Sequence, residues 1–204
     1  MKASVDRAIQ RWAGEVEGVF ALSDLRVVLG DRTEAALYKR LNDLVNSGTL
    51  IKVKRGIYAT PEASLISISN RIDPAAYVST GAILARNAVI GSIPVRKVQA
   101  VKTGRPRVYR CALGVIEHFS LSPRLYFGFT SVDGVLCATA EKAFLDVCYY
   151  TYKGKRFSFD PATDVNTAAL DRQTISDYLA RYDRRFISYF NRIWGDRWRR
   201  SNRP

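Results

Sequence analysis

The sequence predicts an α+β fold, in which an N-terminal winged helix-turn-helix domain precedes a mixed α/β domain with an antiparallel sheet and C-terminal helices. Three observations favour this fold class. Amphipathic helical segments and a short basic hairpin occupy the beginning of the chain, β-rich runs separated by turn residues occupy the middle, and an apolar stripe at helical spacing lies near the end. We predict a first domain at 1–60, a connecting helix or linker at 61–75 and a second domain at 76–204.

The first domain is predicted from the order helix, helix, helix and hairpin, which is the order of a winged helix-turn-helix. Ser23 is expected to cap a helix over roughly 24–29, and Thr33 the helix that follows. Gly48 is expected to end this last helix. Its buried face follows the i, i+4, i+7, i+8 pattern and consists of Leu37, Leu41, Leu44 and Val45.

The exposed face of that helix and the tip of the hairpin are the predicted DNA contacts. Lysine and arginine side chains reach guanine, asparagine reads adenine with two hydrogen bonds, and cations on a hairpin neutralise phosphates. The candidate DNA-binding residues are Arg32, Thr33, Tyr38, Lys39, Arg40, Asn42, Lys52, Lys54, Arg55 and Gly56. Gly56 supplies the positive φ of a tight turn and lets the backbone come close to the duplex. The competing interpretation of the helix is a solvated polar face.

The second domain is expected to begin with a helix capped by Ser79 and closed by Gly91. Four β-rich runs follow and predict a four- or five-stranded antiparallel sheet. Thr139 is expected to cap a helix over "ATAEKAFLDVCYYTY". The last stretch carries one apolar stripe, formed by Ile175, Leu179, Tyr182, Phe186, Phe190 and Ile193.

Charge is the strongest compositional signal. The 204 residues include 32 Lys and Arg against 19 Asp and Glu, a formal net charge of +13, which favours a polyanionic partner: DNA, RNA or an acidic protein. Residues 86–110 contain several cations and no acid, and from them we select a candidate surface of Arg96, Lys97, Arg105 and Arg107. Such a surface suits an acidic protein or further DNA, and charges that protect sheet edges are the alternative. The arginine-rich end after 181 fits either a stacking and phosphate-binding tail or a solubilising end.

Several classes of function find little support. Three cysteines without a CxxC pair argue against a disulfide framework and a zinc site, and a single histidine, His118, excludes His-pair chemistry. Neither GxxxxGK[ST] nor GxGxxG occurs. We therefore expect a non-enzymatic protein without cofactor or metal. No apolar run reaches the ~18 residues of a membrane span, and charges in residues 1–20 argue against a signal peptide, so the expected location is the cytoplasm.

Three segments in order resemble the AbiEi-type antitoxin family. "GVFALSDL" with "LYKRLNDLVNSGTLIKVKRGIYAT" is similar to the N-terminal winged helix of these proteins, "DPAAYVSTGAILARNAVIG" to the opening of their second domain, and "GVLCATAEKAFLDVCYY" to a helix written around an "ATxEKALLD" core. The similarity covers roughly residues 15–152.

The resemblance implies an antitoxin of a bacterial type IV toxin–antitoxin system with a link to phage defence. Such a protein represses its own operon by binding double-stranded promoter DNA, and its second domain counteracts a nucleotidyltransferase-like toxin, for which no stable complex is required. On this view Arg96, Lys97, Arg105 and Arg107 are the expected toxin-counteracting surface. The alternative is a stand-alone winged-helix regulator, or an RNA- or protein-binding module, with no toxin partner.

Overall fold

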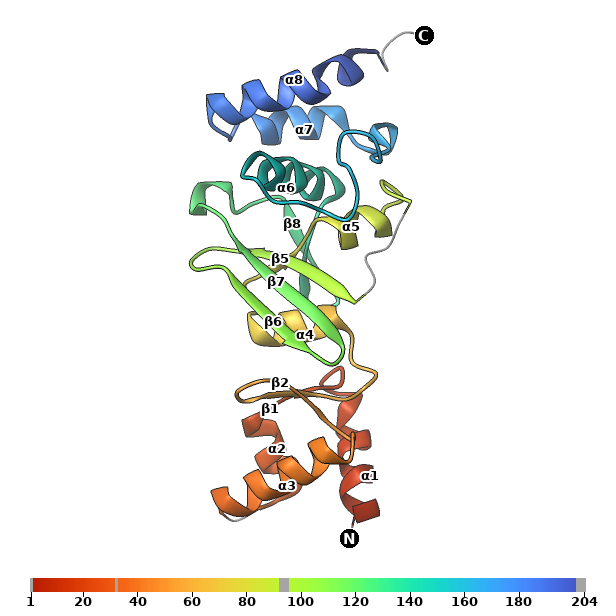
Figure 1. Ribbon diagram of the computed structural model, residues 1–204, viewed down its shortest axis with the longest axis vertical. Coiled ribbons are helices and arrows are strands. Elements are labelled where there is room, and N and C mark those ends of the chain that lie inside the picture. Colours follow the sequence, from red (N-terminus) through yellow and green to blue (C-terminus); the bar gives the residue numbers. More distant parts are fainter. Residues whose placement is uncertain (1, 32, 92–95, 201–204) are drawn as a thin grey trace. The chain divides into compact units, whose positions relative to one another are not determined.

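The computed structural model describes residues 2–31, 33–91 and 96–200 (Figure 1). The chain divides into two compact units: Met1–Pro74 with Val108–Ile116, and Ala75–Arg107 with Glu117–Pro204. Helices and two β-sheets alternate along the chain, so the fold is α+β at this level of description. The first unit therefore combines the N-terminal segment with a short piece from the middle of the sequence.

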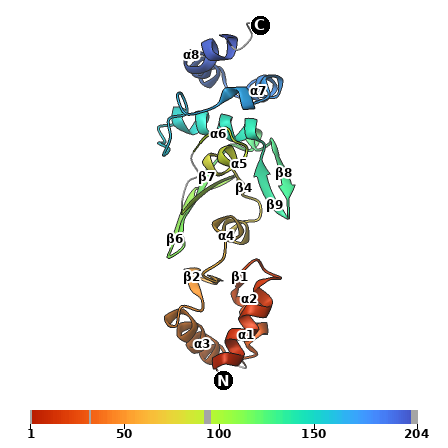
Figure 2. The same ribbon diagram turned by 90° about the vertical axis from the view of Figure 1, so that its right-hand side faces the viewer.

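The first unit contains four helices and a small sheet in its N-terminal segment. Its elements are α1 (Lys2–Ala13), β1 (Val19–Ala21), α2 (Leu22–Leu29), α3 (Glu34–Asn46), β2 (Ile51–Lys54), β3 (Ile57–Ala59) and α4 (Leu65–Ile72). The strands pair antiparallel in the order β1-β3-β2. Helices α1, α2 and α3 lie on one side of this sheet and α4 on the other, as the two views agree (Figures 1 and 2).

Each face of the small sheet has its own apolar core. On the helical side, Phe20 and Tyr58 pack with the buried leucines of α2 and α3. On the other side, Val19, Val53 and Ile57 pack with Ile68 of α4 and with Ile116 from the middle of the chain. Because alternate side chains of a strand point to opposite faces, a three-stranded sheet can contribute to both clusters.

Of the two N-terminal caps predicted in the first unit, one is confirmed and the other is wrong. The Thr33 hydroxyl accepts a hydrogen bond from the Ala36 amide at 3.2 Å, which confirms the predicted cap. Ser23 does not cap α2, contrary to expectation. That helix starts at Leu22, and the Asp24 carboxylate accepts the Ala21 amide hydrogen bond at 2.8 Å. Residues after 60 form the short helix α4, which begins after Ser64.

The second unit contains most strands of a six-stranded sheet; residues Val108–Ile116 of that sheet belong to the first unit. The strands of this sheet and the helices of the second unit are, in chain order, β4 (Tyr77–Val78), α5 (Gly81–Arg86), β5 (Lys97–Lys102), β6 (Arg107–Cys111), β7 (Gly114–Ser120), β8 (Phe129–Val132), β9 (Val135–Ala138), α6 (Ala140–Tyr152), α7 (Arg172–Leu179) and α8 (Arg184–Arg200). Single 3-10 turns lie at Pro123–Leu125 and Thr167–Ala169. The strand order is β6-β7-β5-β4-β9-β8.

The predicted four- or five-stranded antiparallel sheet is wrong in two respects. The sheet has six strands, and β4 pairs with β9 in parallel. Strand β4 was not predicted because it has only two residues and ends just before Ser79 and Thr80, the segment that was expected to start a helix. Ser79 does not cap α5 either; the buried Ser79 hydroxyl donates a hydrogen bond to Asp146 at 2.8 Å instead.

Helices form two layers over this sheet. Helix α6 lies next to the sheet, and α7 and α8 lie on the far side of α6 (Figure 2). Thr139 caps α6 as predicted, since its hydroxyl accepts the Lys142 amide hydrogen bond at 3.2 Å. Helix α8 packs on α6 through Phe186, Phe190 and Trp194, all of them buried.

A buried ion pair lies at the centre of the second unit. The ammonium group of Lys142 donates a hydrogen bond to the Asp146 carboxylate one turn further along α6, and both side chains are fully inaccessible to solvent. The hydroxyls of Tyr77 and Ser79 donate to the other carboxylate oxygen at 3.0 and 2.8 Å. Lys142 also donates to the Tyr182 hydroxyl at 3.2 Å. This network links β4, α6 and the segment between α7 and α8.

Burial governs the titration of this network. Removal from water lowers the pKa of Lys142, while the charge and hydrogen bond of Asp146 act in the opposite direction. Burial, together with the Asp146 charge, raises the pKa of both Tyr77 and Tyr182.

No helix among the described residues is long and apolar enough to span a lipid bilayer.

Candidate nucleic-acid interface

The buried leucines of α3 decide which of its residues face solvent. Leu37, Leu41 and Leu44 are buried in the core of the first unit. Because a helix turns through 3.6 residues, side chains between these leucines lie on the opposite face. The exposed residues of that face include Tyr38, Lys39 and Asn42, all predicted DNA contacts, and the Tyr38 side chain is 42% exposed. The face therefore presents aromatic, cationic and amide groups together.

The first turn of α3 is occupied by local interactions. Thr33 is exposed, and its hydroxyl is the cap of the helix. Glu34 pairs with Arg26 of α2 at 2.9 Å, which offsets an acidic charge that would otherwise repel phosphate. Amide groups at a helix N-terminus attract anions. Arg32, the remaining predicted contact here, lies outside the described residues.

Arg40 has a different role from its neighbours on α3. Its guanidinium lies 2.9 Å from the Asp31 carboxylate, whose side chain is only 6% exposed. The pair connects α3 to the turn that follows α2, so Arg40 holds the helix in place and is not free for a base. Periodicity placed Arg40 on the polar face but gave no sign of its partner, because the contact depends on the path of the α2–α3 turn.

The β2–β3 hairpin presents the other predicted cations. Lys52 and Arg55 are exposed and Lys54 is half-buried. The pairing of the two strands shifts register between Lys52 and Lys54, which places Lys54 opposite Ile57. Gly56 has a φ of 79°, and a side chain there would meet no atom within 4 Å, so glycine is required for backbone conformation and not for space.

The turn of the hairpin is anchored to the helices of the same unit. The Gly56 carbonyl accepts a hydrogen bond from the Leu22 amide at the start of α2, at 2.9 Å. Tyr58 of β3 is buried in the core formed with α3, and burial followed by the neighbouring Tyr38 raises the pKa of its hydroxyl. The hairpin and the exposed face of α3 are thus held by one packed core.

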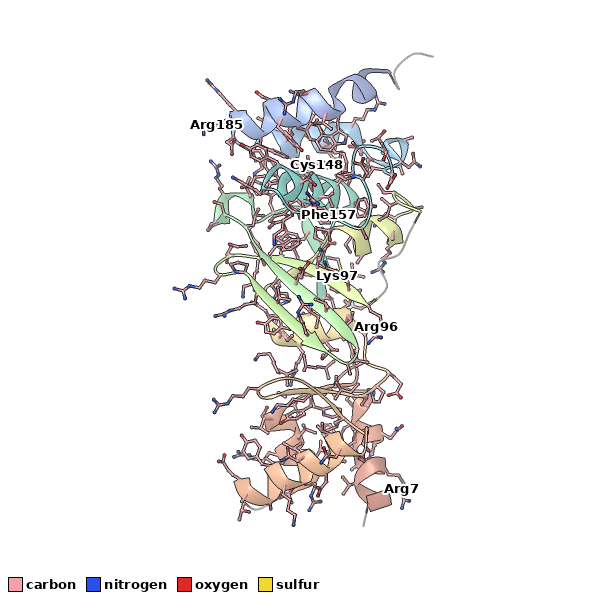
Figure 3. All side chains as sticks on the ribbon, in the orientation of Figure 1. Arg7, Arg96, Lys97, Cys148, Phe157 and Arg185 are labelled. Carbon is pink, nitrogen blue, oxygen red and sulfur yellow. The ribbon has the colours of Figure 1, made fainter. Side chains whose placement is uncertain are left out.

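The basic residues selected in the second unit do not form a single cluster. Lys97 is paired with Glu117 of β7 at 2.9 Å, and Lys97 and Arg96 lie at the start of β5 (Figure 3). Arg105 and Arg107 are exposed and follow the end of β5. Five residue steps separate the two ends of β5, about 17 Å at the rise of a strand. Residues 86–110 contain no acidic residue, but Glu117 of the neighbouring strand β7 lies beside Lys97 in the fold.

Glu117 is held in its charged form by these contacts. Burial alone favours the neutral acid, but hydrogen bonds from Gln99 and Lys97 and the positive charge of Lys97 leave its pKa below the usual range. Lys97 is thus the partner of a structural carboxylate. Arg96, Arg105 and Arg107 remain as exposed cations of the selected set.

The described residues contain no group of three or more His, Cys, Asp and Glu side chains placed to hold a metal ion. His118 is 1% exposed, within β7. Cys111, Cys137 and Cys148 are free thiols, and burial raises the pKa of Cys148 well above its ordinary value. The exposed face of α3 and the β2–β3 hairpin, which carry the predicted DNA contacts, are the candidate site of the first unit.

Comparison with known proteins informs the fold alone. The crystal structure of the RV2827C protein from Mycobacterium tuberculosis is similar to this chain, with a TM-score of 0.51 and 13% sequence identity. The similarity covers 97% of this chain and 71% of that one. No protein-family model matches the sequence, and no curated protein matches it.

Proposed function

We propose that the first unit is a winged helix-turn-helix that binds double-stranded promoter DNA. In this proposal α3 enters the major groove, where Lys39 and Asn42 read bases, and the β2–β3 hairpin lies along the adjacent phosphates. The observation that carries it is the exposed polar face of α3 anchored through one core to a hairpin with Lys52 and Arg55 exposed at its surface. The net charge of +13 supports a polyanionic partner.

The sequence resemblance extends the proposal to the rest of the chain. We infer a cytoplasmic, non-enzymatic antitoxin of the AbiEi type, which represses its own operon and counteracts a nucleotidyltransferase-like toxin. The inference rests on the segments quoted above, of which the "ATAEKAFLD" segment contains the buried Lys142–Asp146 pair. A stand-alone winged-helix regulator is the second candidate, favoured by the same DNA-binding geometry and distinguished by the absence of a toxin gene beside its own.

The protein is expected to bind duplex DNA from upstream of its own gene more tightly than random duplex at physiological salt. Replacing Lys54 and Arg55 by Ala should weaken binding to both duplexes about equally and reduce the slope of log affinity against log salt by about two, one for each lost phosphate contact. Fluorescence anisotropy at several salt concentrations measures both quantities. Equal affinity of the unaltered protein for the two duplexes would contradict the repressor proposal.

Adjacent residues of α3 provide a matched pair for this experiment. Lys39→Ala removes an exposed cation and should relax base preference while leaving the melting temperature close to that of the unaltered protein. Arg40→Ala removes the partner of the poorly exposed Asp31 and should lower the melting temperature. If Arg40→Ala alters base preference and Lys39→Ala does not, the orientation assigned to α3 is wrong.

The antitoxin proposal predicts rescue of growth when the chain is co-expressed with a nucleotidyltransferase encoded beside its gene. Charge reversal at Arg105 and Arg107 should abolish rescue while DNA binding persists, because like charges at a complementary interface cost several kcal/mol. Lys97 is left intact in this variant because it neutralises Glu117. Full rescue by the reversed variant would remove Arg105 and Arg107 from the toxin-counteracting surface.

A further inference from the structure

A groove in the second unit combines cations with aromatic rings. It is about 530 Å³ in volume and is lined by Tyr152 at the end of α6 and by Arg184, Arg185, Ser188, Tyr189 and Arg192 of α8. None of these side chains is acidic. The three arginines are exposed, and Arg185 extends from the start of α8 away from the fold (Figure 3).

The groove follows from the amphipathic character of α8. Phe186, Phe190 and Trp194 recur every fourth residue and are buried on one side of the helix. Arg184, Ser188 and Arg192 have the same spacing and form a row on a different side. The polar row is therefore fixed in register by the burial of the aromatic row.

The two tyrosines of the groove are held in place by neighbouring rings. The ring centroids of Tyr152 and Tyr189 are 5.1 Å apart, Tyr152 lies 5.7 Å from Phe186, and Tyr189 lies 6.0 Å from Trp194. Both tyrosines are half-buried, so part of each ring faces the groove. Rigid aromatic surfaces of this kind lose little conformational freedom when a planar ligand stacks on them.

Cations flank this aromatic pair on both sides. The Arg192 guanidinium carbon lies 5.7 Å from the Tyr189 ring centroid, and the Lys153 ammonium lies 5.3 Å from the Tyr152 ring centroid. Within the described part of the chain, Arg184, Arg185 and Arg192 form no ion pair. Asp183, the acid next to Arg184 in the sequence, accepts the Phe186 amide hydrogen bond at 2.9 Å and faces Arg124. The positive charge of the groove is thus not neutralised by these residues.

We propose that this groove binds single-stranded nucleic acid, with unpaired bases stacked on Tyr152 and Tyr189 and phosphates bound by Arg184, Arg185 and Arg192. Exposed tyrosine rings beside arginines match the alternation of base and phosphate along a single strand. Duplex DNA keeps its base faces stacked inside and offers the tyrosines no partner. An acidic peptide satisfies the arginines but leaves the ring surfaces unused. This site is separate from the duplex-binding surface proposed for the first unit and does not depend on it.

The test uses the full-length protein and labelled single strands of about 10 nucleotides, oligo-uridylate and oligo-thymidylate, with random duplex and poly-glutamate as competitors. Tyr189→Leu is expected to weaken single-strand binding at least about 5-fold, and Tyr189→Phe, which keeps the ring, to retain it. Arg184→Gln with Arg185→Gln should reduce the salt slope by about 0.7 for each lost phosphate contact. Preference between uridylate and thymidylate shows whether RNA or DNA is the better ligand.

The control removes the same charge elsewhere in the second unit. Arg105→Gln with Arg107→Gln should leave single-strand affinity within about twofold of the unaltered protein, because neither residue lines the groove and salt screens exposed charges that do not contact the ligand. Circular dichroism melts confirm that each variant is folded. Binding by Tyr189→Leu equal to that of Tyr189→Phe would overturn the stacking site. Competition by poly-glutamate as effective as by oligonucleotide would assign the groove to an acidic protein and also overturn the proposal. The variants of the first unit test duplex binding separately, so a failure of the duplex-binding proposal would not alter the result of the single-strand experiment.

Discussion

The Asp146→Asn variant is expected to lose about 3–5 kcal/mol of the free energy of unfolding, because it leaves the Lys142 ammonium buried without a counter-charge. Both side chains are fully inaccessible, so water cannot replace the lost partner. The neighbours left to the ammonium include the Tyr182 hydroxyl and the rings of Tyr77 and Phe127, whose centroids lie 5.6 and 5.1 Å away, and none of them carries a negative charge. Urea unfolding followed by circular dichroism measures the loss.

A second variant separates the cost of an unpaired charge from the cost of lost packing. Lys142→Met combined with Asp146→Asn removes both charges, keeps a side chain of similar length, and keeps an amide oxygen to accept the hydroxyls of Tyr77 and Ser79. The double variant is expected to recover most of the lost stability. Lys153→Met at the exposed end of α6 is the control and should change stability by less than about 1 kcal/mol. A double variant as unstable as Asp146→Asn would mean that the carboxylate acts mainly as an acceptor for the two hydroxyls.

The pH dependence of stability gives an independent readout of the same pair. The pKa of Lys142 in the fold lies below its ordinary value of 10.5. Between the folded pKa and 10.5 the unfolded chain therefore binds more protons, and the contribution of this lysine to stability rises with pH. Tyr77 and Tyr182 have raised pKa values, so their contribution is present below pH 10 and is lost as the pH rises above it. Replacing Lys142 should abolish the rise of stability with pH below 10.5 and leave the loss of stability above pH 10 that the two tyrosines cause.

Local features of the sequence were sufficient for the helices that position the candidate interface. The leucine spacing of α3 identified its buried face, and the caps at Thr33 and Thr139 were recognisable because each hydroxyl acts within its own helical turn. Gly56 was recognisable for the same reason, since a turn between two short strands needs a residue that tolerates positive φ. These features depend on residues that are neighbours in the sequence.

Contacts between residues that are far apart in the sequence could not be predicted from local sequence patterns. The Ser79 hydroxyl was expected at a helix start, but its partner Asp146 is brought near by the parallel pairing of β4 and β9. Lys97 was grouped with exposed cations because Glu117 is on another strand. Likewise, the turn between α2 and α3 decides that Arg40, and not Lys39, is paired with an acid. Non-local strand pairing and turn geometry leave no periodic signal in one sequence.

The fragment of residues 1–60, the predicted first domain, is expected not to unfold cooperatively. It retains the helical core but lacks α4 and the 108–116 segment, which cover the other face of the small sheet. Val19, Val53 and Ile57 lose that cover. Full burial of such side chains contributes about 1.5–3 kcal/mol each, so up to about 5–9 kcal/mol is lost, comparable with the ~5–15 kcal/mol that stabilises a whole domain.

Thermal unfolding of 1–60, of 1–74 and of the full-length chain, followed by circular dichroism, checks this expectation. Fragment 1–74 regains Ile68 of α4 and should unfold at a temperature between those of the other two chains. Replacing Val53 and Ile57 by Thr in 1–60 provides the matched control: if the uncovered face is the cause, these changes should reduce aggregation without restoring a cooperative transition. A fragment 1–60 that melts as sharply as the first unit of the full chain would show that the helical core is sufficient. DNA-binding measurements on 1–60 would then be valid as they stand. Otherwise they require the full-length chain, because the hairpin strands β2 and β3 are packed on both faces of the small sheet.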